Sequence, residues 1–69
     1  MFQKGQLVNW YETYGDINIA KDAGLGIITS IEKLDYFREP VYIFNVYRIK
    51  HGDRMNFEHH HLEKIRSKK

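Results

Sequence analysis

The sequence predicts an all-β domain of four to five short antiparallel strands, for three reasons. Glycine and polar clusters divide the chain into short apolar runs. β-Branched and aromatic residues fill these runs, and apolar residues recur with the period of two that is typical of strands. The only helical candidate, residues 58–68, is short and carries three consecutive histidines, and isolated helices below about 12–15 residues are marginal. We expect at most one short helical turn near the C-terminus, around residues 62–64.

Length and composition limit the chain to one small domain. Its 69 residues include no cysteine, which excludes disulfides and thiolate metal sites, so the core must come from apolar side chains. These make up 42% of the chain. We expect one domain over residues 1–65 and a basic flexible tail over residues 66–69. No run approaches the ~20 apolar residues of a membrane span. A cytoplasmic location is therefore expected.

The first half of the chain predicts two strands and a loop. Residues 6–12 are rich in strand formers, and residues 13–23 form a long irregular loop with several turn-forming residues. The segment Gly24–Gly26 marks a tight entry into the next strand. There, Leu25, Ile27, Thr29 and Ile31 alternate with Ile28, Ser30 and Glu32.

The second half predicts a hairpin and a closing segment. Residues 35–40 form a turn, and Pro40 belongs at the start of the following strand because it has no amide hydrogen. Residues 41–49 are the strongest strand, apolar on both faces, which suggests a central strand or a binding surface. Residues 50–53 form a hairpin turn in which Gly52 is available for positive φ. Residues 54–60 form the return strand.

Three segments resemble the SH3-like small β-barrels. Lys4–Val8 (Lys-Gly-Gln-Leu-Val) is similar to the K-G-x-x-V start of KOW-type domains, and Gly24–Ile28 is similar to their G-x-G-x-V second strand. The ending Phe57 … His61–Ile65 is similar to the last segment of many short bacteriophage-encoded barrels. The resemblance covers Lys4 to Ile65. It implies a closed barrel in which alternating isoleucines fill the interior while Leu62 and Ile65 plug the open end.

Barrels of this class serve ribosomes, transcription factors, chromatin readers and virions, so the resemblance constrains function weakly. The similarity is clearest to short phage proteins, which implies a virion component or a modulator of a host protein. The loop at residues 13–23 is longer than the KOW pattern has there, which argues against KOW-style RNA binding.

The aromatic side chains exceed what a core of this size can hold. We assign Trp10, Phe44 and Phe57 to the core. An exposed protein-binding patch is then predicted from four tyrosines, Tyr11, Tyr14, Tyr42 and Tyr47. The alternative is ordinary packing at the barrel edge. The expected partner is a larger protein, and the doubly apolar strand 41–49 also allows a homodimer.

Basic residues suggest nucleic-acid binding as the alternative function. Arg48, Lys50 and Arg54 bracket one hairpin, and Lys68 and Lys69 in the tail add loose attraction to phosphates. The plainer interpretation is a solvated hairpin tip. Removing the three tail charges, those of Arg66, Lys68 and Lys69, from the formal net charge of +2 leaves the body at −1, whereas nucleic-acid binders usually carry a basic face on the body.

The three consecutive histidines are the last candidate site. If the strand continued through them, His59 and His61 would share a face about 6.5–7 Å apart along the backbone. They could then ligate zinc or nickel with Glu58 or His51, or form a pH-sensitive patch. A polar strand end is the plainer alternative. No nucleophile–base pair, paired carboxylates or phosphate loop stands out, so we expect neither enzymatic activity nor a cofactor.

Overall fold

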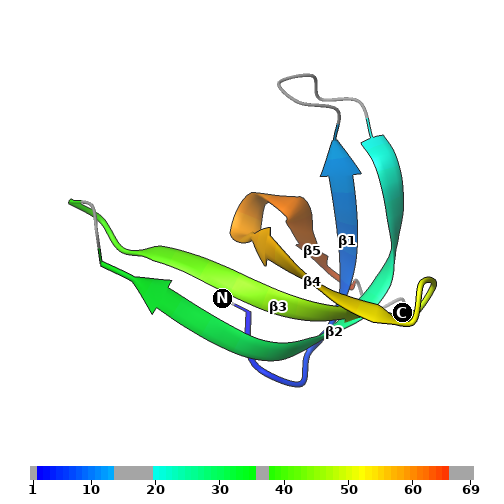
Figure 1. Ribbon diagram of the computed structural model, residues 1–69, viewed down its shortest axis with the longest axis horizontal. Coiled ribbons are helices and arrows are strands. Elements are labelled where there is room, and N and C mark those ends of the chain that lie inside the picture. The colour runs from blue at the N-terminus through cyan, green and yellow to red at the C-terminus, as the bar shows by residue number, and fades with distance from the viewer. Residues whose placement is uncertain (1, 14–19, 36–37, 66–69) are drawn as a thin grey trace.

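A computed structural model describes residues 2–13, 20–35 and 38–65 of the chain. It contains one antiparallel sheet with the strand order β4-β3-β2-β1-β5 (Figure 1). The strands are β1 (Leu7–Thr13), β2 (Ala20–Leu34), β3 (Val41–Arg48), β4 (Asp53–Glu58) and β5 (Leu62–Lys64), and a single 3-10 turn, η1 (His59–His61), separates the last two. The all-β class, the strand number and one short C-terminal helical turn are therefore confirmed.

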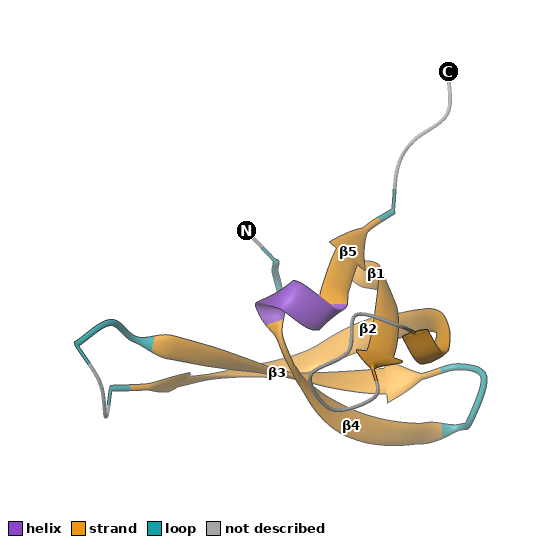
Figure 2. Ribbon diagram, turned by 90° about the horizontal axis from the view of Figure 1, so that it is seen from above, coloured by secondary structure: helices purple, strands orange, loops and turns teal. Residues whose placement is uncertain are grey.

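The sheet is open, in contrast to the closed barrel that we expected. β4 and β5 are its two edges, and within the described residues no ladder joins them. The chain instead passes from one edge to the other through η1 (Figure 2). The turn lies at His59–His61 rather than at residues 62–64, because Leu62–Lys64 pairs with β1. The return strand also ends earlier than predicted, at Glu58 instead of residue 60.

The predicted loop at residues 13–23 is partly wrong. Residues 20–23 belong to β2, where Ala23 pairs with Tyr11 and Asp22 with Glu12, while residues 14–19 lie outside the described residues. β2 and β3 extend beyond their neighbours and project as a two-stranded arm (Figures 1 and 2). Pro40 immediately precedes β3, and Gly52 has φ 68° in the hairpin turn before β4, as the sequence predicted.

A β-bulge decides which face of β2 is buried. Ile28 pairs with Val46 but Ser30 pairs with Asn45, so Thr29 is an extra residue in β2. The Thr29 hydroxyl lies within hydrogen-bond distance of the Asn45 side-chain oxygen (2.6 Å). An inserted residue reverses the side on which all following side chains point. The expectation that the alternating isoleucines fill the interior is therefore wrong in detail, because only Ile28 is buried.

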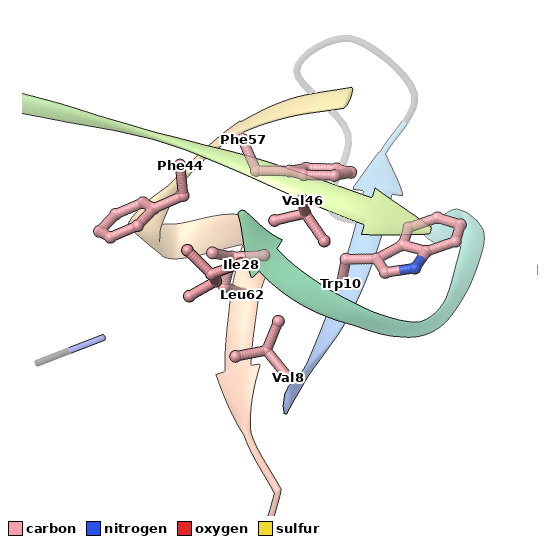
Figure 3. Packing of buried hydrophobic residues seen from close by; sticks show 7 residues of the cluster. All are labelled: Val8, Trp10, Ile28, Phe44, Val46, Phe57 and Leu62. Atoms are coloured by element: carbon pink, nitrogen blue, oxygen red, sulfur yellow. The ribbon is translucent and has the colours of Figure 1, made fainter. Parts of the chain in front are cut away.

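The core lies on the concave side of the sheet (Figure 3). It consists of Val8, Trp10, Ile28, Phe44, Val46, Phe57 and Leu62. Trp10 is fully buried, stacks on Phe57 at a centroid distance of 5.8 Å, and donates its indole hydrogen to the Leu25 carbonyl at 3.0 Å. The three aromatic core residues that we predicted are confirmed. Ile65 is a correction, since it is 41% exposed and only Leu62 covers the core at this end.

Gly26 lets the sheet bend tightly around this core. A Cβ atom at this position would lie 2.4 Å from Val46 Cγ1 and 2.8 Å from the Tyr47 carbonyl oxygen. No side chain fits there, so Trp10 and Val46 fill the interior at this point of β2. None of the helical structure in the described residues is long and apolar enough to cross a membrane.

Candidate functional site

The convex side of the sheet carries a continuous row of exposed apolar side chains. Directly paired residues of a sheet lie on the same side, and Leu7 pairs with Ile27, which pairs in turn with Tyr47. A second row lies beside the first, because the Ile49 amide donates to the Leu25 carbonyl at 3.1 Å and continues the β2–β3 register. We call this surface the apolar face. Its members are Leu7, Leu25, Ile27, Tyr47 and Ile49.

The strands place these residues outward for a simple reason. Val8 follows Leu7 in β1, and Gly26 separates Leu25 from Ile27 in β2. Val8 and Gly26 are both buried on the core side. Because successive residues of a strand point to opposite sides, Leu7, Leu25 and Ile27 face the convex side. Each member of the apolar face is between 38% and 49% exposed. Ile31 is equally exposed at 38%, but the bulge at Thr29 places it on the side of Phe44, away from this face.

Two charges of opposite sign flank the apolar face. Arg54 of β4 pairs with Tyr47 at one end of the first row. Glu63 lies in β5, the opposite edge strand, where it pairs with Asn9 of β1. Continuation of the β1–β5 register places Ile65 opposite Leu7. Neither Arg54 nor Glu63 forms an ion pair within the described residues.

The predicted tyrosines do not lie together. Tyr47 belongs to the apolar face, whereas Tyr42 packs against the core from the opposite face of β3. Tyr11 lies at η1, where its hydroxyl donates to the His60 carbonyl at 2.5 Å. Tyr14 lies outside the described residues. Of the three described tyrosines, only Tyr47 is positioned as the predicted patch requires.

Arg48, which we considered for nucleic-acid binding, forms ion pairs within the protein instead. Its guanidinium makes a two-pronged contact with Asp53 (Nε–Oδ1 2.8 Å, Nη2–Oδ2 2.7 Å) and a third with Glu12 at 3.3 Å. It also lies over the Trp10 ring, 5.0 Å from the centroid. This contact with Asp53 raises the pKa of Arg48 and lowers the pKa of Asp53. Arg48 therefore covers the core at Trp10.

Lys50 is also engaged, at a small cluster centred on Asp22. The ammonium of Lys50 lies 2.7 Å from one oxygen of Asp22, and Nε2 of His51 lies 2.7 Å from the other. Lys50, and then His51, hold the pKa of Asp22 well below its usual range. Of the three basic hairpin residues, only Arg54 remains outside these pairs. The tail residues Lys68 and Lys69 lie outside the described residues.

The histidines are arranged differently from the strand that we assumed. They form η1, so His59 and His61 do not share a strand face. The Nδ1 atom of His61 donates to the Tyr11 carbonyl at 2.9 Å, which leaves Nε2 as the one ring nitrogen of His61 that could ligate a metal. No group of three or more His, Cys, Asp or Glu side chains suited to a metal gathers in the part of the chain that is described.

A pocket of about 320 Å³ opens between the end of β1, β4 and η1. Glu12, Glu58 and His61 contribute polar atoms to its lining. However, Glu12 contacts Arg48 and the His61 Nδ1 atom contacts a backbone carbonyl, so these groups already have partners within the fold. The third, Glu58, lies 3.6 Å from Nδ1 of His60.

Comparison with known proteins found no matching family model, no matching curated protein and no matching solved structure. The resemblance to SH3-like and phage-encoded barrels therefore remains a prediction from sequence motifs.

Sequence reasoning missed four of the five members of the apolar face. Leu7, Leu25, Ile27 and Ile49 were counted as strand formers, and Ile27 also as one of the isoleucines that fill the interior. A signal was available in Gly24–Ile28. Glycine at position 26 and isoleucine at position 28 occupy one face, so the alternating Leu25 and Ile27 must occupy the other.

Proposed function

We propose that the protein is a non-enzymatic binding module that docks its apolar face against another protein surface. The observation that carries this proposal is the gathering of five large, partly exposed apolar side chains in two adjacent rows of one sheet. Isolated exposed apolar residues need no explanation, but a continuous patch of this kind is typical of interaction sites. Tyr47 adds an aromatic anchor of the sort that dominates binding energies.

The contacts of the basic residues favour a protein over a nucleic acid as the partner. Arg48 and Lys50 are neutralised by Asp53, Glu12 and Asp22. Phosphate binding by the hairpin would have to break these contacts or rely on Arg54. The resemblance to short bacteriophage-encoded barrels favours a virion component or a modulator of a host protein as the setting for such a module.

Two matched variants test the proposal. Ile27 and Ile31 lie in the same strand and are each 38% exposed, but only Ile27 belongs to the apolar face. We expect proteins that the wild-type chain captures from its source cells to be lost with Ile27→Glu and retained with Ile31→Glu, as measured by quantitative mass spectrometry. Equal capture by both variants would contradict the proposal. A salt-titrated gel shift that gives tight, Arg54-dependent binding of DNA or RNA would favour the alternative.

A further inference from the structure

We infer that the outer edge of β4 binds an extended segment of another protein, which joins the five-stranded sheet as an additional strand. The inference goes beyond the proposed function, because this edge is separate from the apolar face. Three observations support it: the position of the pocket beside β4, the unpaired strand edges that border this pocket, and the alternation of side chains along β4.

The pocket of about 320 Å³ runs along the outer edge of β4. Four consecutive residues of this strand, Met55–Glu58, contribute to its lining. Successive side chains of a strand point to opposite sides of the sheet, so four in a row border one pocket only where the pocket wraps around the edge of the strand. The pocket therefore borders the backbone of β4 as well as its side chains.

The strand edges on the two sides of the pocket are unpaired within the described part of the chain. There, β4 is the last strand of the sheet and pairs only with β3. The other side of the pocket is formed by Glu12 and Thr13 at the end of β1, beyond Trp10, where the pairing with β5 stops. Neither proline nor a bulge interrupts β4, although such features commonly protect exposed strand edges. The edge therefore offers its backbone groups to a further strand.

The side chains along β4 define the kind of segment that fits. On the concave side, Phe57 is part of the core and Met55 packs against it. Asn56 and Glu58 lie on the convex side. The Glu58 side chain is 54% exposed, and its carboxylate lies 3.6 Å from Nδ1 of the exposed His60. An added strand alternates in the same way, so apolar residues of the segment face Met55 and Phe57 while basic residues lie beside Glu58.

A short peptide in which lysine and valine alternate, blocked at both ends, is a direct probe of this edge. We expect it to shift the amide NMR resonances of residues 53–58 and to slow the hydrogen exchange of the amides on the outer edge. Ile27→Glu should bind the peptide as the wild type does, because the apolar face takes no part, so failure here leaves the proposed function standing. β4 resonances that do not change at about 1 mM peptide would overturn the inference.

Two N-methylated forms of the peptide test whether main-chain pairing holds it. Only every second residue of a strand directs its amide hydrogen to a given neighbouring strand. Methylation of the valine amides and methylation of the lysine amides should therefore have unequal effects. We expect one form to lose about tenfold or more in affinity and the other to lose less than about threefold. Equal losses would show that the peptide does not bind as a strand.

Charge reversal at Glu58 tests the preference for basic residues, and Glu32 supplies the matched control. Both side chains are exposed and both residues pair with Ile43, from opposite sides, so Glu32 carries the same charge two strands from the pocket. Glu58→Lys should raise the dissociation constant of the lysine–valine peptide by about fivefold, and Glu32→Lys by less than about twofold. Far-UV circular dichroism checks that both variants keep the fold. Equal effects of the two substitutions would remove Glu58 from the binding site.

Discussion

Replacement of Arg48 by alanine should destabilise the fold, because this side chain links three strands around Trp10. Its guanidinium contacts Asp53 through two bonds of 2.7 and 2.8 Å and Glu12 through one of 3.3 Å. It lies 5.0 Å from the centroid of the Trp10 ring. The Arg48 side chain is only 12% exposed although it is charged, so the fold depends on these partners to keep it there.

The size of the effect follows from the same contacts. Hydrogen bonds to charged groups contribute about 1.5–3 kcal/mol each in mutational series. The carboxylate of Asp53 is 51% exposed, so solvent screens its share and the lower end applies. Loss of the aliphatic stem over Trp10 adds to the cost. We expect Arg48→Ala to lower the free energy of unfolding by about 2 kcal/mol, which for a domain of this size lowers Tm by about 8–16 °C.

Arg54→Ala is the matched control, since it removes the same charge from the same hairpin. Arg54 is exposed and has no ion pair among the described residues, so its loss should change the free energy of unfolding by less than about 0.5 kcal/mol. Thermal and urea unfolding, followed by circular dichroism and by the fluorescence of the single tryptophan, measure both. Equal losses for the two variants would refute the reasoning. Nucleic-acid binding that depends on Arg48 in a variant of unchanged stability would refute it as well.

Two further outcomes are expected elsewhere in the sheet. Gly26→Ala should lower the free energy of unfolding by about 1–3 kcal/mol, because its Cβ would lie 2.4 Å from Val46 Cγ1; urea unfolding measures this, and a loss below about 0.5 kcal/mol would argue against a tight fit. The pKa of Asp22 is lowered in the folded state by Lys50 and His51, so the stabilisation it contributes is complete above its unfolded pKa of about 3.9 and is lost as the pH falls below that value. Stability measured from pH 7 to pH 2 should therefore fall more steeply for the wild type than for Asp22→Asn, and parallel curves would show that the cluster makes no contribution.

Local features of the fold could be predicted from the sequence because their causes are local. Pro40 marks the start of β3 because it lacks an amide hydrogen, and Gly52 marks the hairpin because its φ is positive. The bulge at Thr29 has no such mark. It depends on how β2 aligns with Asn45 of β3, and a single extra residue reverses the orientation of every later side chain in the strand. For this reason Ile31 and Ile27, which share a parity in the sequence, lie on opposite faces.

In the candidate site, too, only features with a local cause could be predicted from the sequence. Tyr42 and Tyr47 are five residues apart in one strand, an odd separation that places them on opposite faces, so the sequence already argued against one shared tyrosine patch. The role of Arg48 was not accessible in this way. Its partner Glu12 is 36 residues away in β1. A count of basic residues in a hairpin cannot show which carboxylates the fold brings to them.

The convex side of the sheet shows that folding does not require apolar residues there. Asn45 and Asn56 occupy the same side of β3 and β4, pair directly, and hydrogen-bond through their side chains at 2.9 Å. Strands β3 and β4 thus accept polar residues at convex positions without leaving a buried polar atom unsatisfied among the described residues. The 38–49% of Leu25, Ile27 and Ile49 that stays exposed after folding loses contact with water only when another surface covers it. Ile27→Glu should therefore keep the fold while it abolishes docking, and this separation gives the capture experiment its discriminating power.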